Sequence, residues 1–171
     1  MTLASVRPRR PSAWLAAPML LCALASLIFA LPVRVAGLQL PEPVFAMVPA
    51  FAWAAIRPSI LAPFALLIVG AFLDLLWGAP LGLWPLCLMF AYAFTFTMRP
   101  SLSGQNFAAL WAWYAAACMV GMAAGMVLTT LAAGVVPNLI GAAWQWLASA
   151  ALFPAAHRLI NRHQEAEGRF R

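Results

Sequence analysis

The chain contains 171 residues, of which 65% are hydrophobic and only 8% are charged. A soluble domain of this size needs far more charged side chains to cover its surface, so the composition excludes a soluble fold and predicts an all-α polytopic membrane protein. The net charge of +6 comes from arginines in short gaps between apolar runs, a pattern that is typical of membrane topology signals and does not indicate nucleic-acid binding.

A polar, basic segment over 1–12 precedes the first apolar run and is expected to lie in the cytoplasm. We interpret 13–156 as a transmembrane domain, because its apolar runs recur at lengths that suit a bilayer. A second basic tail follows over 157–171. The six transmembrane helices are expected over 13–31, 40–56, 60–77, 81–98, 106–130 and 138–156.

The connection over 32–43 contains three prolines and Arg34, and we place it on the outer side of the membrane. Pro49 lies well inside the second expected helix, so a kink is predicted there. A short turn over 57–59 follows, in which Pro58 disfavours helical geometry for the residue before it. Arg57 is expected to fix this turn on the cytoplasmic side.

The stretch GAFLDLLWGAPLGLWPL, over 70–86, contains the one acidic residue within the apolar runs, Asp74. A carboxylate at membrane depth costs about 2.5–3.5 kcal/mol at a helix centre on insertion scales, so a nearby group must compensate for it. Asp74 is about 21 Å from the start of the third helix, in the outer third of a hydrocarbon core roughly 30 Å thick. It also lies in the last turn of that helix, where the dipole disfavours a negative charge.

Three kinds of donor are available to Asp74. One is the set of backbone N–H groups at the start of the fourth helix, around 81–83. The indoles of Trp77 and Trp84 and the guanidinium of Arg34 are the others. The sequence does not choose among them. It also leaves open whether Asp74 only caps a helix and fixes the hairpin, or anchors an outward-facing pocket or partner interface.

Glycine and proline positions predict where helices end and where they pack. Gly78 suits the left-handed residue that ends a helix, and Pro80 suits the first position of the next helix. In the fifth helix, Ala117, Gly121 and Gly125 recur at four-residue spacing, which lets another helix approach closely. Packing within the chain is the favoured interpretation, and association of two copies is left open.

The distribution of arginines predicts the orientation. Only Arg34 falls in a segment assigned to the outer side. The nine cytoplasmic arginines are Arg7, Arg9, Arg10, Arg57, Arg99, Arg158, Arg162, Arg169 and Arg171. A bias of this size predicts that both termini are cytoplasmic.

The sequence offers few groups for catalysis or metal binding. Cys22, Cys87 and Cys118 lie in three different apolar runs without metal-ligand or redox spacing, so each is interpreted as a packing residue. His157 and His163 lie in the C-terminal tail and are expected to be solvated. No paired intramembrane carboxylates or metalloprotease motif occur. We therefore expect a scaffold or binding role, with no catalytic residue, metal or cofactor.

Two segments together resemble the MreD family of bacterial rod-shape-determining membrane proteins. PAFAWAAIRP, over 49–58, resembles a family helix that ends in a characteristic pattern, here Trp53, Arg57 and Pro58. The 70–86 stretch resembles the family's hairpin at Asp74, Gly78, Pro80, Leu81 and Gly82. The chain departs from the family at Ala50, where the family often has an acidic residue.

The resemblance implies a six-helix fold similar to the substrate-binding subunits of energy-coupling-factor vitamin transporters. It implies a non-enzymatic scaffold of the cell-elongation machinery, the elongasome, in the bacterial inner membrane. The implied partner is an MreC-type single-span periplasmic protein, which links the chain to MreB filaments and to the RodA-type glycosyltransferase and penicillin-binding transpeptidase of peptidoglycan synthesis. Because the loops are short, partners are expected to make contact within the membrane or at its rims.

Two other functions were weighed. In a vitamin-type transporter subunit, Asp74 and the turn after it would line an outward pocket for a small ligand, but the fourth to sixth helices contain few polar residues to recognise one. A membrane-embedded lipid-modifying enzyme needs a catalytic pair that the sequence does not present.

Overall fold

The computed structural model describes residues 11–29, 34–35, 38–39, 42–56, 58–134, 137–154 and 156–158. The described residues are predominantly helical, which confirms the all-α class. Two two-residue strands, β1 and β2, pair antiparallel with Arg34 opposite Gln39. The elements are α1 (Pro11–Phe29), β1 (Arg34–Val35), β2 (Leu38–Gln39), α2 (Met47–Ile56), α3 (Leu61–Trp77), α4 (Leu83–Leu102), α5 (Phe107–Ala133) and α6 (Leu139–Ala150).

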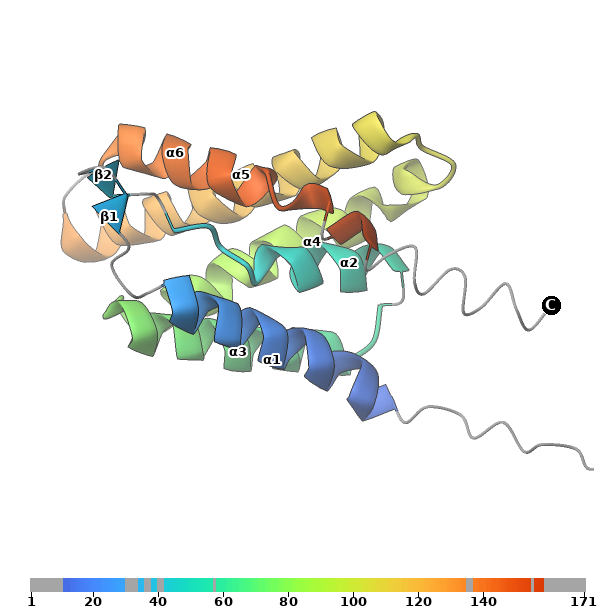
Figure 1. Ribbon diagram of the computed structural model, residues 1–171, viewed down its shortest axis with the longest axis horizontal. Helices are drawn as coiled ribbons and strands as arrows, with labels where there is room; N and C mark the ends of the chain where they lie inside the picture. The colour runs from blue at the N-terminus through green and yellow to red at the C-terminus, as the bar shows by residue number, and fades with distance from the viewer. Residues whose placement is uncertain are drawn as a thin grey trace, which may run out of the picture.

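The connections between helices alternate between the two ends of an elongated bundle (Figure 1). The β1–β2 pair and the α3–α4 and α5–α6 connections lie at the left end in this view, and the α2–α3 and α4–α5 connections lie at the right. This alternation is the one that the expected order of spans requires. The left end therefore corresponds to the predicted outer side, and the right end to the predicted cytoplasmic side.

One helix among the described residues is long and apolar enough to cross a membrane alone. It covers Phe107–Ala132, with a mean hydropathy of 1.8 over its most apolar window, of which 28% is buried in the bundle. The apolar stretches Leu15–Phe29, Met47–Ile56 and Leu61–Trp77 are shorter. The six spans and their orientation consequently stay predictions.

The second helix differs most from its expected bounds. It was expected over 40–56, but α2 begins at Met47 and has 10 residues. Pro49 therefore lies in its first turn, where the missing N–H breaks no helical hydrogen bond, and the predicted kink was wrong. The start is formed by a tight turn in which the Met47 N–H donates to the Val44 carbonyl at 3.1 Å.

Helix ends in α4, α5 and α6 also differ from the expected bounds. α4 begins at Leu83 instead of 81, because Gly82 is left-handed with φ 97°, and it continues to Leu102 instead of 98. α5 continues to Ala133 instead of 130. α6 ends at Ala150, and a turn separates it from the helical residues near 156–158. Pro154 supplies no N–H for the Ala150 carbonyl, so a helical hydrogen bond is missing at the residue where α6 ends.

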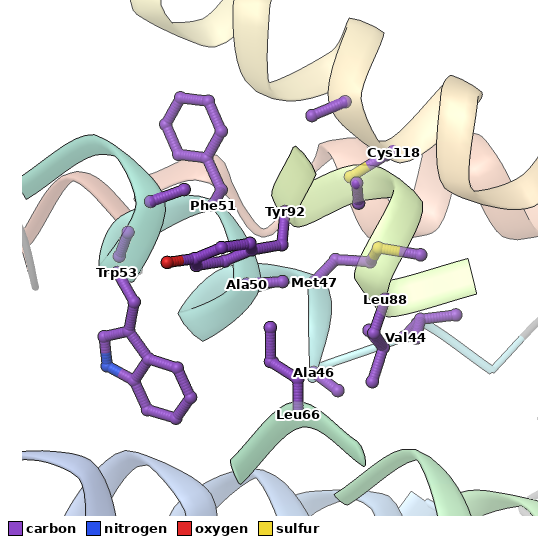
Figure 2. Close-up of a cluster of buried hydrophobic side chains, with 14 of the residues drawn as sticks. Val44, Ala46, Met47, Ala50, Phe51, Trp53, Leu66, Leu88, Tyr92 and Cys118 are labelled. Atoms are coloured by element: carbon purple, nitrogen blue, oxygen red, sulfur yellow. The ribbon is translucent and has the colours of Figure 1, made fainter. Parts of the chain in front are cut away.

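The core is organised around α2. Seven of its ten residues are buried, including Phe51, Trp53 and Met47. Figure 2 shows α2 side chains enclosed by residues of three other helices, among them Leu66 and Leu88. The Phe51 ring packs edge-on against Tyr114 of α5, with ring centroids 5.3 Å apart. A helix this short is marginal in isolation, so its stability comes from these contacts.

Candidate functional site

The α3–α4 connection begins with a left-handed glycine. Gly78 has φ 63° and ψ 29°, and its N–H donates to the Asp74 carbonyl. The Ala79 N–H donates to the same carbonyl at 2.9 Å. A residue with a Cβ is strained at this φ, so the sequence predicted the role of Gly78 correctly.

A second turn follows within three residues. The Leu83 N–H donates to the Pro80 carbonyl at 3.1 Å. Gly82 has φ 97° and ψ −8°, close to the values for the third residue of a type II turn. Pro80 is therefore the first residue of this turn, and the expectation that it opens the next helix was wrong.

The Asp74 carboxylate closes the hairpin. The Gly82 N–H donates to Oδ2 at 2.7 Å, and the Trp84 N–H donates to Oδ1 at 2.9 Å. Asp74 is only 1% exposed. Both donors belong to the start of α4, where the helix dipole favours a negative charge. Of the three kinds of donor that the sequence offered, the structure shows backbone N–H groups at the start of the fourth helix. The carboxylate therefore caps α4.

The two tryptophan indoles have another role beside the hairpin. The Trp77 and Trp84 rings pack against each other, with centroids 4.8 Å apart at 65°. Within the described residues, the Trp77 indole N–H has no hydrogen-bond partner. The Arg34 side chain lies outside what the structure describes. The indoles therefore form an aromatic contact beside the hairpin rather than a hydrogen-bond donor set for Asp74.

A close backbone contact fixes the base of the hairpin. A Cβ on Gly70 would lie 2.4 Å from the Pro85 nitrogen and 2.5 Å from its Cα. Neither atom can move without displacing the α4 backbone. Gly70 therefore allows α3 and α4 to touch at the level of Asp74. At the other end of the hairpin, Leu81 is 80% exposed and Leu75 is 75% exposed.

In the segment over 49–58, which also resembles the MreD family, the described residues pack in the bundle and form no site. Trp53 is fully buried, and Pro58 is half-buried at the start of the α2–α3 connection. Arg57 lies outside the described residues. Arg99 instead reaches the end of α2, where its Nη2 donates to the Ile56 carbonyl at 3.1 Å and its Nε to Ala55 at 3.3 Å.

The small-residue face of α5 packs within the chain. A Cβ on Gly121 would lie 2.8 Å from the Cys87 carbonyl oxygen, and one on Gly125 would lie 2.7 Å from the Cys87 Sγ. Ala117 is buried in the same core. These residues bring α5 against α4, which is the interpretation that the sequence favoured.

Ser149 is a buried junction that sequence reasoning missed. Its Oγ accepts from the Val44 N–H at 3.0 Å and donates to the Gln145 carbonyl at 2.8 Å. Its carbonyl accepts from the Tyr114 hydroxyl at 3.1 Å. One residue thus joins α6 to the segment before α2 and to α5. No pattern in the sequence pairs positions so far apart.

Among the described residues, the side chains that could catalyse a reaction or bind a metal do not lie together. Within the described residues, no group of three His, Cys, Asp or Glu side chains is placed to hold a metal. Cys22, Cys87 and Cys118 are buried on three helices. His157 is half-buried and stacks edge-on against Phe107, with centroids 5.0 Å apart, so the expectation that it is solvated was wrong. His163 lies outside the described residues.

Comparisons of the chain with protein-family models, with curated proteins and with solved structures find no match.

Proposed function

We propose that this chain is a non-enzymatic inner-membrane scaffold of the cell-elongation machinery, and that it binds an MreC-type single-span protein at the hairpin end of the bundle. The observation that carries the proposal is the hairpin itself. All five positions that resemble the MreD family there belong to one capped hairpin: Asp74, Gly78, Pro80, Leu81 and Gly82. A pattern that builds one specific turn is more informative than the same residue types scattered along a chain.

The state of the carboxylate supports a structural role in that turn. Each oxygen of Asp74 accepts a backbone N–H, and the side chain is 1% exposed. Its charge is therefore used to hold the start of α4. A transporter subunit that bound its ligand through Asp74 would need this carboxylate to be accessible to the ligand, and it is 1% exposed.

The outer surface of the hairpin supports a partner that contacts the chain within or beside the membrane. The connection over 78–82 is short, and it presents Leu81 at its tip. Leu75 is similarly exposed on the last turn of α3. Rigid backbone beneath exposed leucines lowers the entropy cost of docking a partner helix.

The remaining parts of the proposal follow from the arginine distribution, which sets the orientation, and from the resemblance, which supplies the partners. Both termini lie in the cytoplasm, the chain contacts MreB filaments and the RodA-type and penicillin-binding synthases indirectly through its MreC-type partner, and membrane lipids surround the bundle. The end of the bundle that carries the α2–α3 and α4–α5 connections would then face the cytoplasm, because it lies opposite the hairpin (Figure 1).

The test is affinity recovery of the tagged full-length chain from detergent-solubilised native membranes, followed by mass spectrometry. We expect a single-span periplasmic coiled-coil protein together with cell-wall synthases. Recovery of transporter ATPase subunits in their place would contradict the proposal and favour a substrate-binding subunit. Recovery of neither, from membranes in which both groups are detected, would also contradict it.

A further inference from the structure

A cavity of about 270 Å³ lies between the start of α4, the second half of α5 and the start of α6. Its apolar walls include Trp84, Met122 and Met126. Gly125 and Gly141 also line it. At Gly141 the missing side chain leaves the space open, because a Cβ there would have only Asn138 atoms near it, at 3.9 Å or more. Methionine walls adapt to ligands of different shapes because the side chain is unbranched and polarisable.

Three polar residues line the same cavity: Thr129, Asn138 and Gln145. Asn138 uses its Oδ1 to cap α6, accepting from the Ile140 N–H at 3.0 Å, so its amide N–H donors are left over. No hydrogen bond within the described part of the chain uses the side-chain amide of Gln145. The bond from the Ser149 hydroxyl goes to the backbone carbonyl of Gln145. The cavity therefore offers donors and an acceptor beside an apolar wall.

We propose that this cavity binds an uncharged amphiphile whose hydroxyl or amide head group hydrogen-bonds Asn138 and Gln145. No residue that lines the cavity is charged. An ionised head group would lose its hydration there without gaining a counter-ion, so the site selects against it. The volume is slightly below the range of about 300–1,000 Å³ for drug-sized ligands, so the head group and the first part of a chain fit inside.

The hairpin positions one wall of this site. The Trp84 backbone N–H is held by Asp74, and the Trp84 ring is fixed against Trp77. The cavity thus lies at the predicted outer end of the bundle, where a neutral lipid or a free polyol has access. The proposal is independent of the scaffold function. The chain could bind an MreC-type partner without binding a ligand, and it could bind a ligand without such a partner.

The larger groove on the bundle does not support the same inference. It has a volume of about 360 Å³ and is lined by Pro18, Leu21, Cys22 and other apolar residues of α1, α2 and the segment after α6. Without a polar side chain to orient a head group, it resembles an ordinary lipid-facing surface.

Cys87 provides a reporter inside the cavity. It lines the cavity, is 1% exposed, and becomes the only thiol when Cys22 and Cys118 are changed to alanine. We would measure the rate at which N-ethylmaleimide alkylates Cys87 in the full chain in phosphatidylcholine nanodiscs. The probe is 1-decanoylglycerol, with ionised decanoate and glycerol alone as the charged and chain-free comparisons.

We expect saturating 1-decanoylglycerol to slow alkylation about tenfold, which corresponds to about 1.4 kcal/mol, and decanoate or glycerol at the same concentration to leave the rate unchanged. Gln145→Leu should remove the protection, whereas Gln105→Leu, on the exposed α4–α5 connection, should retain it. Gly141→Leu fills the cavity from an open position and should also remove it.

Three results would overturn the proposal. The first is equal protection by decanoate or by glycerol, which would contradict the charge or the chain requirement. The second is protection that survives both Gln145→Leu and Gly141→Leu. The third is the absence of protection, including a Cys87 that does not react even without a probe. Recovery of the MreC-type partner is read separately, so failure here leaves the scaffold proposal standing.

Discussion

Asp74 in the hairpin and most side chains of α2 are deeply buried, but the two regions are held in different ways. The hairpin is closed by a carboxylate whose two donors are 8 and 10 residues further along the chain. α2 is held by groups from distant helices: Ser149, 105 residues from Val44, at its start, and Arg99, 43 residues from Ile56, at its end. The hairpin is a local unit, whereas α2 depends on the assembled bundle.

This difference predicts how damage spreads. A change in the hairpin should loosen the start of α4 and the turn before it. A change in α2 should loosen contacts with α3, α4 and α5 together, because residues of these three helices surround its side chains (Figure 2). The two regions can therefore be separated by where hydrogen exchange increases.

The largest effect is expected for Trp53→Ala. Removing this fully buried ring should cost about 3–5 kcal/mol of stability, because it leaves a cavity at the centre of the bundle. Thermal unfolding in detergent measures the loss, and hydrogen exchange should rise in several helices. Exchange that rises only within α2 would contradict the central role of this helix. Trp144→Ala, on the exposed face of α6, is the control.

Asp74→Ala is expected to cost about 2–5 kcal/mol, since it leaves the Gly82 and Trp84 N–H groups without their acceptor. Asp74→Asn keeps one acceptor oxygen but turns an amide N–H2 toward the other donor, so about half of the loss should remain. The same unfolding assay ranks the three proteins. Stability that is equal in all three would remove the capping role of Asp74.

Gly121→Ala should cost about 1–3 kcal/mol, because its Cβ would meet the Cys87 carbonyl oxygen at 2.8 Å. Gly121→Leu should cost more. The matched control is Gly141→Ala, where the nearest atom is 3.9 Å away and no clash arises. If the two alanine variants unfold at the same temperature, the close α4–α5 approach is not supported.

The smallest of these effects is expected for Ser149→Ala, at about 1–2 kcal/mol, because the buried Val44 N–H loses its acceptor. Hydrogen exchange at the Val44 amide should accelerate, while the Gly82 and Trp84 amides of the hairpin should be unaffected. Acceleration at the hairpin amides would show that the two regions are not independent.

The same contrast explains what the sequence could predict. Asp74, Gly78 and Gly82 lie within nine positions, so short-range turn and capping rules were enough to locate the hairpin. They included the backbone N–H groups among three kinds of donor to Asp74, but only the structure chooses among these. Pro80 was expected at the first position of the fourth helix, but it begins the turn before that helix. Proline suits both positions, so the sequence alone does not distinguish them.

Long-range junctions lay beyond such rules. Hydropathy marked the second apolar run but could not locate the start of α2, which is set by a turn at Val44 and its bond to Ser149. Local patterns also did not indicate that α6 ends at Ala150, whose carbonyl accepts from the Trp111 indole N–H at 3.0 Å.

The central claim is that the hairpin end of this bundle binds a membrane partner, and one pair of substitutions tests it most directly. Leu81 is 80% exposed on the hairpin, and Ile60 is 84% exposed at the opposite end. Neither side chain is packed in the core, so Leu81→Ser and Ile60→Ser should both fold normally. We predict that Leu81→Ser loses most of the MreC-type protein recovered from native membranes, while Ile60→Ser retains it. Equal recovery by both variants, at equal abundance and melting temperature, would contradict the account.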